Sequence, residues 1–217
     1  MGEAALLIEC TLDDIAEANA HALALTRVLP TEWHPLPAIR SVLVRFDPLR
    51  YTQDEVQAYV QDALAHATPG ALPPGRQVTI PVRYGGEDGP DLEDAARQLG
   101  LAPDELIAQH TARPWRVLMI GFAPGFPYIG PLPASLTLPR RDTPRAAVPA
   151  GSVAIAAGMT GIYPSQLPGG WHLIGRTEVT LFDPAREPPT FLQAGDHVQF
   201  VAIASGNPTE EEKIATG

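Results

Sequence analysis

The residues best suited to chemistry in this chain form a basic cluster in its second half. Between residues 121 and 176 the sequence holds four arginines and a single acid, Asp142, although the whole chain carries a formal net charge of −10. Arginine presents a planar fork of N–H donors that captures a carboxylate or phosphate through two hydrogen bonds at once. A nearby glycine and serine add a backbone and a hydroxyl donor. The predicted anion-binding wall consists of Arg140, Arg141, Arg145, Gly151 and Ser152.

The alternative for such a charge run is a solvated loop whose arginines pair with surface acids. Because acids are scarce around the cluster, the sequence favours neither interpretation over the other. The net charge of −10 argues against a nucleic-acid backbone as the partner.

The stretch that surrounds the arginines is rich in glycine, proline and aromatic residues. Residues 121–130 read GFAPGFPYIG, and residues 121–170 contain 8 Gly and 9 Pro. Average use of these two residues together is about 12%. We expect a shaped loop surface that binds something, against the alternative of tight turns with aromatics covering the end of a barrel. The predicted rim and partner contacts are Gly125, Phe126, Pro127, Tyr128, Tyr163, Gly169, Gly170 and Trp171.

A catalytic base is harder to identify. The six histidines are scattered, without metal-ligand spacing, and we expect no metal site. His110 ends a predicted helix just before the strand that leads into residues 121–130, which makes it the candidate general base or hydrogen-bond donor to a substrate. The alternative is a protonated histidine stabilised by the helix C-terminus. No Walker loop, dinucleotide fingerprint or nucleophile elbow is present, so the chain alone shows no way to hold ATP.

The first part of the chain must form a small α+β domain. We predict strands at residues 4–9 and 39–46 and helices at 14–29 and 52–66. Thr11 and Asp14 have capping-box-like spacing, and Thr52 with Glu55 forms a clean capping box. Cys10, the only cysteine, is expected to be a small buried residue of the first strand. The Pro/Gly-rich segment 68–75 marks the boundary, so this domain covers residues 1–75.

The second part must form a mainly β domain at residues 76–204. A strand at 77–83 is followed by a turn-rich loop and two helices, 91–99 and 103–110. Short strands joined by Gly/Pro turns indicate a barrel or sandwich, with strands expected at 115–120, 153–156, 171–175, 179–182 and 197–203. The polar tail, residues 205–217, is expected to be disordered. The sequence shows no membrane span and no secretory signal, so a cytoplasmic location is the default expectation.

Taken together, the motifs resemble a known family. In order along residues 81–201, the chain carries YGG at 84–86, GPDL at 89–92, His110, GFAPGFPYIG at 121–130, PRRDTPR at 139–145, VPAGSV at 148–153, TGIYP at 160–164, PGGW at 168–171, GRT at 175–177 and LFDP at 181–184. This series resembles the subunit 1 family of allophanate hydrolase-type proteins. That family includes the B-type protein of bacterial 5-oxoprolinase and a sporulation-kinase inhibitor of the same architecture. Trp115, where relatives have Tyr, and Leu167, where Ser or Thr is usual, depart from the pattern.

The resemblance implies a cyclophilin-like β-barrel after the α+β domain. The sequence lacks the Arg-Phe…Gln arrangement of a true prolyl isomerase, so we do not expect that activity. It also implies an ATP-dependent 5-oxoprolinase that opens 5-oxo-L-proline, a cyclic amide, to L-glutamate. ATP with magnesium would act at the level of a complex with a subunit 2 (C-type) protein and an A-type protein, and the chain would be inactive alone. Two alternatives remain: an inhibitor of a sporulation-type histidine kinase, and a carboxyltransferase component of a urea carboxylase or allophanate hydrolase-type system. The latter would need a biotin carrier, because this chain has no biotinylation site.

Overall fold

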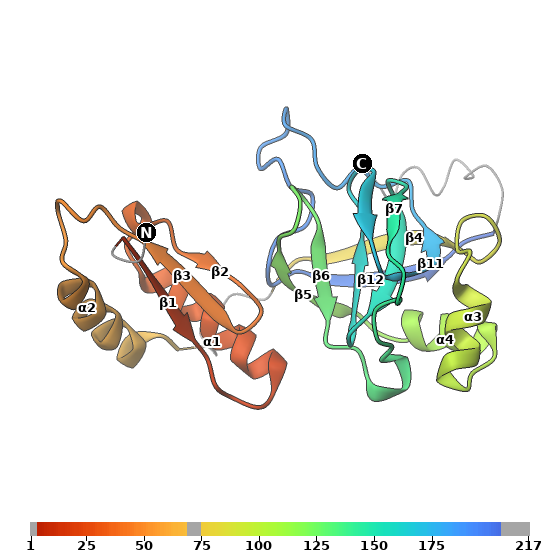
Figure 1. Cartoon of the computed structure of the whole chain (residues 1–217), viewed down its shortest axis with the longest axis horizontal. Coiled ribbons are helices and arrows are strands. Elements are labelled where there is room, and N and C mark those ends of the chain that lie inside the picture. Colours follow the sequence, from red (N-terminus) through yellow and green to blue (C-terminus); the bar gives the residue numbers. More distant parts are fainter. Residues whose placement is uncertain (1–3, 69–74, 205–217) are drawn as a thin grey trace. The chain divides into compact units, whose positions relative to one another are not determined.

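The chain is divided into two compact units. The computed structural model describes residues 4–68 and 75–204, and contacts separate the unit Met1–Pro74 from the unit Gly75–Gly217 (Figure 1). This division lies beside the boundary predicted at residue 75. The tail predicted to be disordered, residues 205–217, lies outside the described residues. No helix in the described ranges is long and apolar enough to span a membrane.

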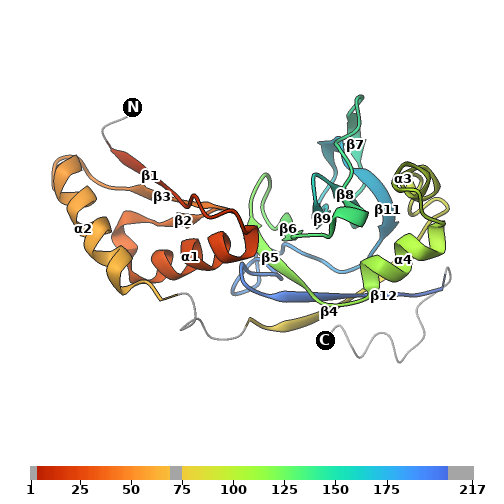
Figure 2. The ribbon, with the colours of Figure 1, turned by 90° about the horizontal axis from the view of Figure 1, so that it is seen from below.

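The first unit is a three-stranded antiparallel sheet with two helices on one face (Figure 2). The strands follow the order β1-β3-β2 across the sheet. Val42 and Val44 point into the core between the sheet and the helices, where they meet Leu25 and Val56. The elements in chain order are β1 (Ala5–Glu9), α1 (Ile15–Val28), the 3-10 turn η1 (Thr31–Trp33), β2 (Leu36–Pro37), β3 (Ser41–Arg45) and α2 (Gln53–His66).

The sequence predicted the N-terminal cap of α2 correctly and that of α1 incorrectly. The capping box of α2 is confirmed, because Thr52 accepts from the Glu55 backbone and Glu55 accepts from the Thr52 backbone. At α1 the cap is Asp14, which accepts from Glu17 N at 2.7 Å, rather than Thr11. Cys10 follows β1 instead of lying within it and is only partly buried, so its prediction is corrected.

The second unit is built around a closed seven-stranded barrel, which confirms the predicted fold class. The barrel order is β11-β4-β12-β5-β6-β9-β8, with β12 parallel to β4 and the other pairs antiparallel. Its strands are β4 (Gln77–Tyr84), β5 (Trp115–Ile120), β6 (Pro127–Gly130), β8 (Ser152–Ala156), β9 (Met159–Ile162), β11 (His172–Arg176) and β12 (His197–Ala202). Apolar side chains such as Ile80, Val117 and Phe200 fill its interior.

Further elements cover the barrel. Helix α3 (Leu92–Leu99) packs on β11, and α4 (Pro103–Thr111) packs on β12. A separate two-stranded sheet pairs β7 (Arg145–Val148) with β10 (Leu167–Gly169), and the 3-10 turn η3 spans Ala134–Leu136. The predicted strand at 179–182 is wrong: its only strand-like feature is an isolated bridge between Phe182 and Thr190. Strands β6, β9 and β10 were not predicted because glycines and prolines interrupt their sequences, and β7 because it is only four residues long and lies between Pro144 and Pro149.

Candidate functional site

The structure gathers the loop motifs around one pocket on the second unit. Its volume is about 280 Å³, and its lining comes from three separate stretches of residues 122–171. The stretch 121–130 contributes aromatics, the stretch 139–145 contributes arginines, and the stretch 163–171 closes the wall. The lining residues are Phe122, Phe126, Tyr128, Arg140, Arg141, Pro144, Tyr163, Pro168, Gly169, Gly170 and Trp171. The motifs that sequence reasoning placed on a shared rim therefore do meet.

Phe126 is the centre of the aromatic side of the pocket. It is 2% exposed and makes edge-to-face contacts with the rings of Tyr163 and Trp171, at centroid distances of 5.1 and 5.7 Å. Tyr128 packs against it at 5.1 Å. Such edge-to-face pairs place the positive ring edge against the negative face of the neighbour. The rings form a fixed apolar wall, with Tyr163 and Trp171 largely buried in it.

Glycine is required where this wall packs most closely. A Cβ at Gly169 would lie 2.1 Å from Tyr163 Oη, and a Cβ at Gly161 would lie 3.0 Å from Phe126 and 3.1 Å from Trp171. The absence of a side chain at these two positions allows the rings to come together. The PGGW stretch therefore shapes the pocket through its backbone.

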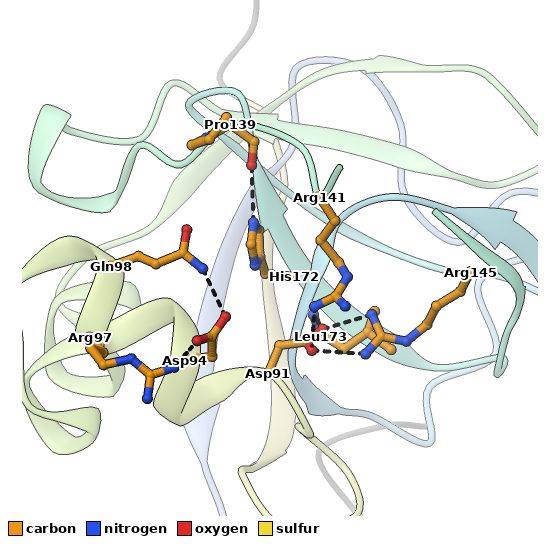
Figure 3. Close-up of polar contacts among 9 residues, drawn as sticks. All are labelled: Asp91, Asp94, Arg97, Gln98, Pro139, Arg141, Arg145, His172 and Leu173. Carbon is orange, nitrogen blue, oxygen red and sulfur yellow. Dashed lines mark hydrogen bonds and ion pairs between the residues drawn. The ribbon is translucent and has the colours of Figure 1, made fainter. Parts of the chain in front are cut away.

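Two of the three clustered arginines are held by a buried acid. Arg141 Nη1 donates to Asp91 Oδ1 at 2.8 Å, and Arg145 donates through Nη1 and Nη2 to both oxygens of Asp91 at 2.8 Å (Figure 3). Asp91 is 5% exposed and also accepts from Leu173 N, at 2.8 Å. Its own N–H donates to Leu173 O at 2.9 Å, which fixes the N-terminal cap of α3 to β11.

Asp91 with Arg141 and Arg145 forms a clamp, which corrects the sequence observation that the arginines have few acidic partners. The pairing acid lies 50 residues before Arg141 and 54 before Arg145, so no local pattern reveals it. Because a buried carboxylate must be neutralised by partners, Asp91 and these two guanidinium groups form a structural unit. Arg145 does not line the pocket, and Arg141, which does, is already bound to Asp91 through Nη1.

Arg140, in contrast to Arg141 and Arg145, is not bound to Asp91. It is exposed, lines the pocket, and makes no ion pair or hydrogen bond through its guanidinium among the described residues. Its positive charge acts on the phenols of the pocket: burial raises the pKa of Tyr128, and Arg140 opposes that rise. Burial likewise raises the pKa of Tyr163, again against the charge of Arg140. Of the predicted anion-binding wall, Arg140 is the cation open to a ligand.

The remaining predicted wall and rim residues support the barrel instead of lining the pocket. Gly151 has φ +78°, and its N–H donates to Tyr163 O at 2.7 Å. Ser152 is 3% exposed and begins β8. Gly125 has φ +81° and lies so close to Phe182 that a Cβ would approach it to 2.8 Å. Pro127 is buried at the start of β6.

His110 lies in the core of the second unit and does not line the pocket. Its Nδ1 lies 2.7 Å from Tyr84 Oη, and its Nε2 lies 2.9 Å from Thr160 Oγ1. Thr160 donates its hydroxyl hydrogen to Ala154 O at 3.1 Å, so it accepts from Nε2–H, and Nδ1 accepts from Tyr84. The pKa of His110 is lowered by complete burial to about 3, which keeps the ring neutral.

This geometry fits neither interpretation that the sequence offered for His110. A general base must reach a substrate proton, and this ring has both nitrogens engaged inside the protein. A protonated histidine at the helix end is contradicted by the lowered pKa. His110 is a hydrogen-bonded core residue that connects β4, α4 and β9.

Sequence reasoning left three lining residues out of the site: Phe122, Pro144 and Pro168. Phe122 is the most informative, because its side chain is 60% exposed and its backbone has φ +69°. A bulky residue in the left-handed region is uncommon and costs about 1–2 kcal/mol. The repeated Gly-Phe pattern of residues 121–126 was a signal for it, but the sequence does not reveal the strained backbone.

Known proteins resemble this chain over nearly its whole length. The family model described as carboxyltransferase domain, subdomain C and D, matches residues 1–192. The chain is 38% identical to the B-type 5-oxoprolinase subunit of Bacillus subtilis, over 94% of this chain and 91% of that protein. It is 54% identical to the B-type 5-oxoprolinase subunit of Haemophilus influenzae, over 58% of this chain and 60% of that protein.

A solved structure supports the same relationship. The crystal structure of TTHA0988 superposes with a TM-score of 0.79 at 36% identity, covering 96% of this chain and 41% of that longer chain. The match to the family model, the relative aligned over 94% of this chain and the shared architecture agree. The chain therefore belongs to the family of carboxyltransferase subdomains C and D that contains the B-type proteins of 5-oxoprolinase.

Proposed function

We propose that this chain is the B-type component of an ATP-dependent 5-oxoprolinase, which opens 5-oxo-L-proline to L-glutamate. The observation that carries the proposal is the 38% identity to a protein of that name across 94% of this chain. The pocket supports it, because an arginine beside an apolar wall of aromatic rings suits a small cyclic acid.

The pocket also supports a division of labour between proteins. Its described lining residues include no Asp, Glu, His, Cys, Ser or Lys. Its two tyrosines, Tyr128 and Tyr163, keep their protons because burial raises the pKa of each, so the lining offers no group ready to act as nucleophile or general base. His110, the sequence candidate, is sealed in the core. We therefore expect the chain to be inactive alone and to act with a C-type protein and an A-type protein of the same system. ATP and magnesium would act in that complex.

The test is reconstitution. The purified chain is mixed with its C-type and A-type partners, and ATP hydrolysis and glutamate formation are followed with and without 5-oxoproline. We expect 5-oxoproline-dependent ATP hydrolysis that requires this chain. Soluble, correctly assembled proteins that hydrolyse no ATP in response to 5-oxoproline would reject the proposed function.

A further inference from the structure

The polar groups of the pocket fall into two sets, those already engaged and those still free. Arg141 is bound to Asp91, and the hydroxyl of Tyr163 forms a hydrogen bond with the backbone of Trp171. Three polar side-chain groups of the lining have no hydrogen bond or ion pair among the described residues: the guanidinium of Arg140, the hydroxyl of Tyr128 and the indole N–H of Trp171. Arg140 and Tyr128 are the two of these that interact electrostatically, and both are available to a ligand that enters the pocket.

Arg140 and Tyr128 act on the same space. Both line the pocket, and Tyr128 is close enough to Arg140 for the positive charge to counter part of the pKa rise that burial causes. Since that pKa is raised overall, the phenol keeps its proton at neutral pH and serves as a hydrogen-bond donor. The pocket thus offers one fixed cation and one neutral O–H donor beside a wall formed by Phe126 and Trp171.

This pair of donors selects a particular ligand chemistry. A guanidinium binds a carboxylate through two parallel hydrogen bonds, and a phenol donates a single hydrogen bond to a carbonyl oxygen. The ring faces suit a small flat apolar body. The volume, about 280 Å³, lies just below the range of about 300 to 1,000 Å³ that ligand pockets usually have. A compact ring acid fits this space better than a nucleotide.

We propose that Arg140 and Tyr128 form the recognition pair for a small cyclic amide acid, with Arg140 binding its carboxylate and Tyr128 donating to its ring carbonyl. The inference rests on the proposed function, which names 5-oxoproline as such an acid. It assigns Tyr128 to the ligand, where the sequence had placed it on a partner rim. It also removes Arg141 and Arg145 from ligand binding and assigns them to the Asp91 clamp.

The experiment uses the reconstituted complex and three variants of this chain. Arg140→Gln removes the carboxylate partner, Tyr128→Phe removes one hydroxyl, and Arg176→Gln is the control, because Arg176 is exposed and does not line the pocket. We expect Arg140→Gln to raise the KM for 5-oxoproline by about 10- to 100-fold and Tyr128→Phe by about 3- to 10-fold. The KM for ATP should not change, and Arg176→Gln should behave as wild type.

Two ligand fragments separate the roles of the pair. Inhibition by 2-pyrrolidinone, which has the ring carbonyl without the carboxylate, should respond to Tyr128→Phe and not to Arg140→Gln. Inhibition by cyclopentanecarboxylate, which has the carboxylate without the amide, should show the reverse. An unchanged KM for 5-oxoproline in an active Arg140→Gln complex would overturn the inference and leave the proposed function standing. A raised KM for ATP in the Arg140→Gln complex would also overturn the inference, because it would show that Arg140 binds phosphate.

If the wild-type complex shows no 5-oxoproline-dependent turnover, the proposed function fails and the pocket is tested separately. Calorimetric titration of the chain with 5-oxoproline then tests whether Arg140 and Tyr128 bind this ligand. Binding that Arg140→Gln and Tyr128→Phe weaken, and Arg176→Gln leaves unchanged, would still support the recognition pair. No binding to wild type, or equal binding to all four proteins, would overturn it. Circular dichroism checks that each variant is folded.

Discussion

The clamp centred on Asp91 gives the sharpest stability prediction. Replacing Asp91 by Asn keeps its size but removes the charge that faces Arg141 and Arg145. One of the two oxygens becomes an NH₂ group, so at least one arginine donor meets another donor. The Asp91 side chain is only 7% exposed, so water cannot replace the lost partner readily.

The magnitude follows from the burial of the pair. Removing one partner of a buried ion pair costs about 3–5 kcal/mol, because the other charge is left without compensation. For a unit of this size, that loss lowers the unfolding midpoint by roughly 10–20 °C. We expect Asp91→Asn to show this shift in calorimetry of the full chain, and we expect faster hydrogen exchange at the Leu173 amide, which donates to Asp91.

Two comparisons make the prediction specific. Glu87→Gln removes a carboxylate from an exposed position in the same turn and should leave the midpoint unchanged. In the double variant Asp91→Asn, Arg145→Met, the partly buried cation is removed together with the buried acid, so the combined loss should be smaller than the sum of the single losses by about 0.5–3 kcal/mol. A small effect of Asp91→Asn, equal to that of Glu87→Gln, or strict additivity in the double variant would refute the clamp.

Three further predictions test the barrel interior and its turns. Burial lowers the pKa of His110 in the folded protein from 6.5 to about 3, so the unfolded chain takes up the proton first as the pH falls. The free energy of unfolding should therefore decrease by about 1.4 kcal/mol for each pH unit below 6.5. An NMR titration midpoint near pH 6.5 for the His110 imidazole of the folded protein would contradict this prediction. Tyr84→Phe leaves the His110 Nδ1 acceptor without its donor and should cost about 1–3 kcal/mol in urea unfolding, whereas no loss would mean that the bond contributes nothing. Gly151→Ala should lower the free energy of unfolding more than Gly86→Ala. Both glycines have positive φ, but only at Gly151 would an added Cβ clash, since it would lie 2.2 Å from Thr177 O. Equal losses of stability in urea unfolding of the two variants would exclude a steric cause.

The sequence predicted those helices and strands whose signals lie within a few consecutive residues. The capping box at Thr52 and Glu55 and the apolar run at 115–120 were predicted correctly, because each signal lies within a few consecutive residues. The strand at Pro127–Gly130 was missed, because proline and glycine usually disfavour strands. It exists because β5 and β9 pair with it on either side, which only the closed barrel arranges.

The candidate site shows the same limit. Sequence reasoning brought the aromatic loop, the arginine stretch and the PGGW turn to one rim, and the pocket is lined by all three. It could not separate Arg140 from its neighbours, since the three arginines look alike in sequence. It also mistook His110 for a possible base, because burial is a property of the packed barrel.

The sequence alone therefore determined the α+β unit, the barrel class and the residue types that gather around the pocket. Tertiary structure decided which of those residues are free to act. Asp91 reaches Arg141 and Arg145 across 50 and 54 residues, and that pairing leaves Arg140 as the open cation of the pocket among the described lining residues. The physical reason is range: caps and periodicity depend on neighbours within a turn or two, whereas ion pairing and burial depend on where the chain returns after the barrel has closed.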